Sequence, residues 1–273
     1  MNQLPHSQRS RVATAPGHGL MRGLKIEFFG LPGSGKTTVA REVHAALARR
    51  HPDLIFAPDF FRDEAAKTTR AAAKLRLILS NLGHDGGSRN AVRQTLAIQQ
   101  PHLRDKLRAV STVATIMAFY ARLDRHGTSA VLDQGLLQAL WSVQLRALNG
   151  DTQALMGDGL SHAVTNNRIY VSVATPATIC ADRLAARHSK HSRLQVRDAT
   201  DAERTWEKAE FLRRSLLNTL TAVGHARGIA PRIITVDGTA RPDETAHQIV
   251  TQLLADGTGR VPRRRMKERG LHA

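Results

Sequence analysis

The sequence predicts an α/β fold in which five parallel strands form a sheet that is covered by helices on both faces. Short apolar runs alternate along the chain with amphipathic stretches of helical length. Each run is continuously apolar, as in strands that are buried on both sides. The length of 273 residues and the apolar content of 41% are sufficient for a sizeable core. We therefore expect one three-layer domain.

The elements of the first half follow from apolar spacing and from the residues that end helices. Pro52, Gly83, Pro101 and Gly127 lie at the breaks, because proline and glycine terminate helices. The expected elements are, in order, a strand at 24–29, a helix to about residue 50, a strand at 54–58 and helices at 61–82, 88–100 and 102–126, with a loop at 84–88.

The second half repeats the alternation of strand and helix. Asn149-Gly150 and the GDG at 157–159 mark a loop, and Pro176 opens a helix, since proline is accepted in a first helical turn. The expected elements are, in order, a strand at 129–133, a helix to about residue 148, a strand at 169–174, the helix after Pro176, a helix at 199–226, a strand at 233–237 and a helix at 242–255.

The net charge of +17 points to an anionic partner. Residues 1–22 contain three arginines and no acid, and residues 257–273 contain six basic residues against one glutamate. Both ends are polar, and we expect a flexible N-terminal extension at 1–22 and a basic flexible tail at 257–273. The folded domain is expected at 23–256, where the remaining charge requires a site or a basic face.

Composition excludes several classes of protein. Cys180 is the single cysteine, which excludes an internal disulfide framework and a multi-cysteine zinc site. The chain contains no apolar run of about 18 residues, so a membrane span is not expected. The head lacks the apolar segment of a secretory signal. These features favour a cytoplasmic protein.

A glycine-rich segment follows the first strand and fits G-x-x-x-x-G-K-[ST] at every fixed position. Glycines allow the backbone to wrap around a phosphate, and the N-terminus of the following helix favours negative charge. We expect Lys36 to reach the β- and γ-phosphates of ATP and the Thr37 hydroxyl to ligate Mg²⁺. The nucleotide-binding residues are expected to be Gly30, Leu31, Pro32, Gly33, Ser34, Gly35, Lys36, Thr37 and Thr38.

The acid at the end of the third strand is the natural partner of this loop. Asp133 closes the apolar run at 129–132, so we expect it on the Mg²⁺ side of the nucleotide, acting through water. The alternative is that Asp133 only caps the next helix.

With these motifs the chain resembles the nucleotide-kinase branch of the P-loop fold, in particular the thymidylate-kinase and deoxynucleoside-kinase group. The resemblance covers about residues 24–255 in element order and implies a P-loop NTPase fold with an Arg-rich lid. It also implies phosphoryl transfer that depends on ATP and Mg²⁺. The segments that carry it are GLPGSGKTT at 30–38, Asp133-Gln134-Gly135, where the family has a D-R motif, YVSVATPATICADRLAARHSKHSR at 170–193, and IITVDG at 233–238.

The segment that corresponds to the family's lid is strongly basic. Arg183, Arg187, Lys190, Arg193 and Arg197 fall within 15 residues that contain no acid after residue 182. Arg183 and Arg187 are one helical turn apart and so share a face. We expect Arg183, Arg187 and Arg193 to contact the transferring phosphate, whose oxygens carry the developing charge. The alternative is a solvated basic helix face.

The phosphate acceptor is left open between a hydroxyl and a monophosphate. Asp59 corresponds to the carboxylate that takes the hydroxyl proton in the family's nucleoside kinases, although a turn or helix-capping role is equally compatible. Gln134 replaces the arginine that would help to hold a monophosphate. Three basic residues could compensate for it, namely Arg62, Arg70 and Arg76. Beside Asp59, Phe60 and Phe61 could stack on a base or pack in the core.

Three functions remain in competition. The first is a kinase of a nucleotide, a nucleoside or a similar small metabolite, with ATP and the acceptor as its partners. The second is a kinase of a non-nucleotide such as a sugar, an antibiotic or a polysaccharide precursor. The third is a regulatory or nucleic-acid-linked NTPase that uses the basic ends. The chain lacks N-K-x-D and L-S-G-G-Q, which disfavours a guanine-specific switch and a transporter ATPase. A nucleic-acid partner is disfavoured and a homodimer is left open.

Overall fold

The computed structural model describes residues 22–67, 69–81, 86–148, 159–165, 167–186, 194 and 199–257. Within these residues a five-stranded sheet has the order β2-β3-β1-β4-β5, and all of its neighbouring strands are parallel. This confirms the predicted α/β fold. The strands are β1 (Lys25–Phe29), β2 (Ile55–Phe56), β3 (Ala130–Leu132), β4 (Arg168–Ala174) and β5 (Arg232–Asp237).

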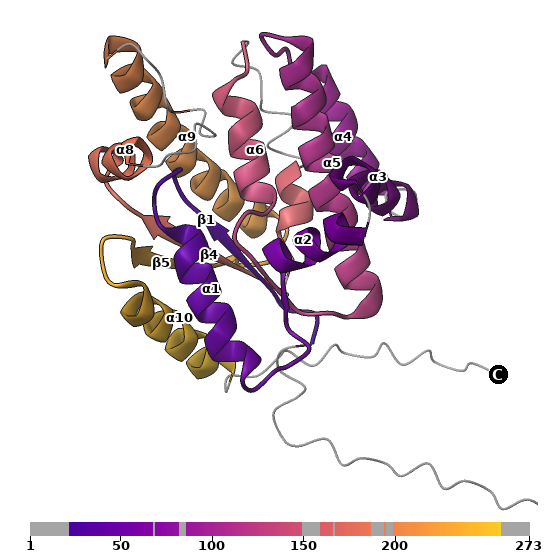
Figure 1. Cartoon of the computed structure of the whole chain (residues 1–273), viewed down its shortest axis with the longest axis vertical. Coiled ribbons are helices and arrows are strands. Elements are labelled where there is room, and N and C mark those ends of the chain that lie inside the picture. The colour runs from indigo at the N-terminus through magenta and orange to yellow at the C-terminus, as the bar shows by residue number, and fades with distance from the viewer. Residues whose placement is uncertain are drawn as a thin grey trace, which may run out of the picture.

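Helices cover both faces of the sheet, as Figure 1 shows. The first face packs on α1 and α10, and the second packs on α5, α6 and α9. Two further helices, α3 and α4, lie against α5, and α2 contacts α3, β2 and β3. The helices are α1 (Lys36–Ala48), α2 (Ala57–Lys67), α3 (Arg70–Asn81), α4 (Gly86–Ala97), α5 (Leu103–His126), α6 (Leu136–Leu145), α8 (Ala177–Ala185), α9 (Ala199–Ala226) and α10 (Pro242–Gly257).

The central strand β1 alternates between two cores. Ile26 and Phe28 pack with α1 and α10, whereas Phe29 packs with the opposite helices. Lys25 and Glu27 are also completely buried, although both are ionisable. Burial of the apolar side chains, Ile26, Phe28 and Phe29, stabilises the fold by about 25 cal/mol for each Å² of apolar surface removed from water. The two charged side chains in β1 need partners, because a buried charge without a partner is costly.

Two predicted boundaries between residues 54 and 100 are wrong. The predicted helix at 61–82 is two helices, and α2 begins at Ala57, directly after a two-residue strand. Pro58 can stand in its first turn because a first-turn residue needs no helical N–H partner. The predicted loop at 84–88 is also wrong, since α4 begins at Gly86. Ala91 and Thr95 of α4 are completely buried, so packing stabilises a helix that the two glycines alone do not favour.

The other expected elements agree with the structure within a few residues, and α9 has the predicted bounds. The largest of these differences are at the end of α4, which is Ala97 rather than residue 100, and at the end of α6, which is Leu145 rather than about residue 148. Nothing in the described part of the chain is a helix of sufficient length and apolarity to cross a membrane. Both predicted flexible ends lie outside the described residues, apart from Arg22 and Gly257 at their inner limits.

Candidate functional site

The glycine-rich segment forms a turn between β1 and α1, as predicted. Gly33 has a φ of 88°, a conformation that side chains rarely adopt, and a Cβ there would lie 2.4 Å from the Cys180 carbonyl oxygen. The turn is closed by the Ser34 amide, which donates to the Leu31 carbonyl at 3.1 Å. Gly35 precedes α1 and offers no side chain to cap its amides. The N-terminus of α1 therefore faces this turn without a side-chain cap.

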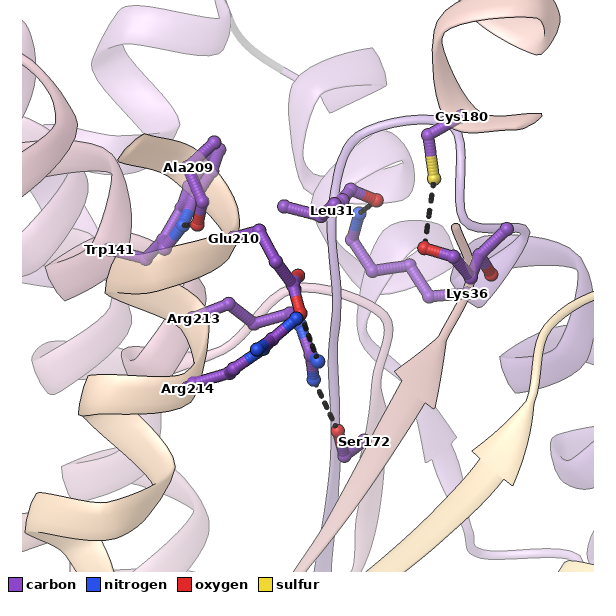
Figure 2. Close-up of polar contacts among 10 residues, drawn as sticks. Leu31, Lys36, Trp141, Ser172, Cys180, Ala209, Glu210, Arg213 and Arg214 are labelled. Atoms are coloured by element: carbon purple, nitrogen blue, oxygen red, sulfur yellow. Dashed lines mark hydrogen bonds and ion pairs between the residues drawn. The ribbon is translucent and has the colours of Figure 1, made fainter. Parts of the chain in front are cut away.

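Three predicted residues meet at the end of this turn. The Thr37 hydroxyl donates a hydrogen bond of 3.0 Å to Asp133, which follows β3. The buried Lys36 side chain folds back so that its Nζ donates to the Leu31 carbonyl at 3.2 Å (Figure 2). Burial raises the pKa of the Asp133 carboxyl above its usual value, while the Thr37 bond and the Lys36 charge act against that rise. The site thus combines an ammonium, a hydroxyl and a carboxylate, and Mg²⁺ prefers the oxygens of the last two.

Arg183 of α8 also lies beside this turn. Its guanidinium Nη1 donates to the Gly238 carbonyl at 3.0 Å and lies 3.5 Å from the Gly33 carbonyl. Arg183, one of the basic residues expected in the lid, therefore lies against the glycine-rich turn. The other basic residues of the segment lie outside the described residues, namely Arg187, Lys190, Arg193 and Arg197.

Arg213 of α9 is a basic residue near this site that is not predicted from the sequence pattern. It forms two hydrogen bonds to the Glu210 carboxylate, at 2.7 and 2.8 Å, and a third of 3.1 Å to the Ser172 hydroxyl of β4, as Figure 2 shows. Partial burial opposes ionisation of Glu210, but the bonds from Arg213 and Arg214 outweigh it and lower the pKa of the carboxyl. Arg213 is thereby held in one orientation at the junction of α9 with the sheet.

Cys180 is a poor candidate for a nucleophile. The side chain is completely buried, and its thiol points to the Thr175 carbonyl oxygen at 3.8 Å. Burial is the largest influence and raises the pKa of the Cys180 thiol to about 11. Because the thiolate is the reactive form, this cysteine is inert near neutral pH.

A cavity of about 710 Å³ opens next to Asp133, between α2, α3 and α5. Phe60 and Phe61 form part of its wall, with ring centroids 5.4 Å apart, and each packs 5.0 Å from the ring of Phe119. Such aromatic pairs bury large apolar surfaces in a fixed geometry. The lining residues are Ala57, Pro58, Phe60, Phe61, Arg62, Ala73, Lys74, Arg76, Leu77, Ser80, Thr112, Thr115, Ile116, Arg122, Asp133 and Gln134.

Asp59 does not line the cavity. It lies in the first turn of α2 and forms an ion pair of 2.9 Å with Arg62. An acid at that place is favourable because it complements the positive end of the helix dipole. The geometry is thus that of the turn-and-helix role rather than that of a base facing the cavity.

The loop that carries Asp133 rests on the buried Glu27. This carboxylate accepts a hydrogen bond of 2.5 Å from the Tyr120 hydroxyl and one of 2.6 Å from the Leu137 amide, in the first turn of α6. Gly135 is required above it, because a Cβ there would lie 2.2 Å from the Glu27 carboxyl carbon. Burial raises the pKa of Glu27, and these hydrogen bonds oppose the rise. Glu27 thereby caps α6 and holds the segment from Asp133 to Leu137 in place.

A second layer of charge surrounds Glu27. The Arg168 guanidinium, which is 5% exposed, lies 3.9 Å from the centroid of the Tyr120 ring. Lys25, in the same strand as Glu27, forms an ion pair with Asp124 of α5. The buried charges of β1 are thus matched by charges from α5 and β4, which limits their cost.

Comparison with known proteins gives one family and several structural matches. Residues 26–211 match a family model described as an AAA domain. No curated protein matches the chain. Two solved structures of deoxyadenosine kinase from M. mycoides, one with bound dCTP and one with the products dCMP and a flexible dCDP, each cover 85% of this chain and 100% of their own. Their TM-scores are 0.44 and their identities 13% and 14%, values too low to assign an activity or an acceptor.

Proposed function

The chain belongs to the AAA domain family, whose model matches residues 26–211, and on this premise we propose that it transfers the γ-phosphoryl group of ATP to a small-molecule acceptor with the aid of Mg²⁺. The observation that carries the proposal is the meeting of Lys36, Thr37 and Asp133 at the edge of a cavity of about 710 Å³. A cavity of this size is suitable for a small metabolite.

The residues present fit a nucleotide and its metal. The Ser34 hydroxyl is buried in the turn and has no hydrogen-bond partner within the described part of the chain, so it can donate to a phosphate oxygen. Thr37 and Asp133 would hold Mg²⁺, which supplies neutralisation of phosphate charge when it is bound. Lys36 would exchange its bond with the Leu31 carbonyl for phosphate oxygens.

Positioning and electrostatics would then account for most of the catalysis. Lys36 and Arg183, which both donate to carbonyl oxygens of the turn, would hold the phosphates, while Asp133 lines the cavity. An acceptor in the cavity would attack the γ-phosphorus as the bond to the ADP oxygen breaks. This arrangement is equally suited to a non-nucleotide acceptor, so the class of acceptor has to be inferred from the residues that line the cavity.

The proposal is tested by incubating the protein with γ-labelled ATP, Mg²⁺ and a panel of nucleosides, nucleoside monophosphates and sugars. We expect label to appear in at least one acceptor and to disappear when Mg²⁺ is removed by a chelator. ATP binding without transfer to any member of the panel would count against a kinase and favour a regulatory NTPase.

Replacing Asp133 with asparagine should separate activity from stability. Because burial raises the pKa of Asp133, the stability linked to this carboxyl is greatest at acid pH and is lost as the pH rises through that raised value. At neutral pH the ionised carboxylate is therefore unfavourable for the fold, and Asp133→Asn keeps an acceptor for Thr37. We expect an equal or higher Tm, with Mg²⁺-dependent transfer reduced about 100-fold or more.

The acid limb of the wild-type pH–rate profile provides a second measure of the same group. Since the carboxylate must be ionised to hold Mg²⁺, the acid limb of kcat/KM for Mg-ATP, which reports groups of the free enzyme, should lie above the usual aspartate value of 3.8. A lower Tm together with full activity in Asp133→Asn would show that this carboxylate is only structural.

Replacing Arg183 with alanine should weaken nucleotide binding more than it alters the fold. The side chain is exposed, and its guanidinium contacts two carbonyl oxygens of the site, those of Gly33 and Gly238. Loss of one charge-assisted phosphate contact should raise the KM for ATP about tenfold. Arg41→Ala, an exposed arginine of α1, is the matched control and should leave the KM unchanged. If both variants have the wild-type KM, Arg183 makes no contact with the nucleotide.

A further inference from the structure

The cavity beside Asp133 has a strong excess of positive charge. Four basic side chains line it, from three different helices: Arg62 of α2, Lys74 and Arg76 of α3, and Arg122 of α5. Asp133 is the single carboxylate among the described residues of its lining. Like charges that share one cavity repel each other, and a bound anion relieves that repulsion.

The four basic side chains differ in whether they form ion pairs with acidic side chains of the protein. Arg62 is paired with Asp59 at 2.9 Å and lies near Asp63 at 3.8 Å. Lys74, Arg76 and Arg122 form no ion pair with any residue that the structure describes, and the Arg122 guanidinium lies 5.2 Å from the centroid of the Phe60 ring. Three cations are thus available to a ligand, and they face the cavity from α3 and α5. The Arg70 side chain lies outside the described part.

The rest of the lining is suited to an organic group of moderate size. Phe60, Phe61, Leu77 and Ile116 provide apolar surface, while Ser80, Thr112 and Thr115 provide hydroxyls. The two phenylalanine rings are fixed by their contacts with Phe119. A ligand with an anionic end and a flat or apolar body would satisfy both halves of this lining.

The position of the carboxylates bears on the chemistry of the acceptor. A hydroxyl acceptor must lose a proton during transfer and benefits from a base within hydrogen-bond reach. Asp59 is paired with Arg62 and lies outside the cavity lining, and Asp133 accepts the Thr37 hydroxyl bond. A phosphate acceptor needs no base, because its attacking oxygen is already ionised.

We propose that the cavity binds a phosphate monoester as the acceptor, with its organic part against Phe60 and Phe61 and its phosphate among Lys74, Arg76 and Arg122. This inference rests on the proposed phosphoryl transfer. An oxygen of the monoester would form a bond to the γ-phosphorus of ATP while the bond to the ADP oxygen breaks. The products are ADP and a diphosphate ester, and no proton has to be removed from the acceptor.

The test compares the binding of nucleosides with that of their 5′-monophosphates by calorimetry. The full-length protein is first saturated with a non-hydrolysable ATP analogue and Mg²⁺, so that the glycine-rich turn is occupied. We expect at least one monophosphate to bind about tenfold or more tightly than its nucleoside. That preference should be lost in the Arg76→Ala/Arg122→Ala double variant and kept in Arg41→Ala, whose changed residue is exposed on α1.

Binding of the ATP analogue separates the two proposals. Suppose that the wild type and the double variant bind the ATP analogue equally, but that the wild type binds nucleosides and their monophosphates with equal affinity. The phosphate acceptor is then excluded, and the proposed phosphoryl transfer is not. A monophosphate preference that persists in the double variant also overturns the inference. Failure of the wild type to bind the analogue contradicts the proposed function itself. Circular dichroism of the double variant checks that it is folded.

Discussion

Replacing Lys36 with alanine should reduce phosphoryl transfer by about 100- to 1,000-fold or more while leaving the fold intact. The side chain is 7% exposed and its Nζ lies 3.2 Å from the Leu31 carbonyl, inside the turn that would hold the phosphates. Removing a positioned donor to the charge that develops in a transition state has effects of this size. The measurement is the initial rate of transfer from labelled ATP at saturating Mg²⁺.

Two controls make the Lys36 result interpretable. Arg41→Ala removes an exposed charge from the same helix and should keep the wild-type rate. Thermal unfolding of Lys36→Ala should remain cooperative, because its amine serves a turn whose shape is also fixed by the Ser34 to Leu31 bond. A folded variant that keeps most of its activity would remove Lys36 from the site.

Replacing Glu27 with alanine should cause the largest loss of stability. The change leaves the Tyr120 hydroxyl and the Leu137 amide without their buried acceptor. A buried donor that loses its partner costs roughly 1–3 kcal/mol, so the loss of two should lower the free energy of unfolding by roughly 2–6 kcal/mol. Activity per folded molecule should fall as well, because the segment that holds Asp133 is no longer fixed beneath Gly135.

Glu27→Gln is the matched control for this variant. Its amide oxygen can still accept from the Leu137 amide, and it removes a charge whose burial is unfavourable, as the raised pKa of Glu27 indicates. We expect its free energy of unfolding to lie within about 1.5 kcal/mol of the wild type in urea titrations. Equal stability of the alanine variant and the wild type would show that Glu27 does not support α6.

Those parts of the site that are local in sequence could be predicted from it. The glycine-rich turn is a run of consecutive residues between a strand and a helix, and the spacing of its glycines predicts its conformation. Asp133 was found because it ends an apolar strand, and parallel strands bring their carboxyl ends to the same edge of the sheet. The bounds of α9 followed from its length and from uninterrupted helical spacing.

Features that depend on distant contacts could not be predicted. Glu27 stands within an apolar strand, and its partners Tyr120 and Leu137 are 93 and 110 residues away. A lone acid in a buried strand was the available signal, since it must find donors in the fold. Arg122 and Lys74 resemble ordinary surface cations of helices until α3 and α5 are placed around the cavity. The start of α4 at Gly86 likewise depends on packing against α5.

The phosphate site is tested most directly by transfer of label from γ-labelled ATP to a monophosphate or other acceptor, measured for the wild type and for Lys36→Ala, with and without Mg²⁺. We expect the wild type with Mg²⁺ to give labelled acceptor, and the variant and the metal-free reaction to give about 100-fold less or none. Equal transfer by the wild type and a folded Lys36→Ala variant, or transfer that does not depend on Mg²⁺, would contradict a phosphate site built from Lys36, Thr37 and Asp133.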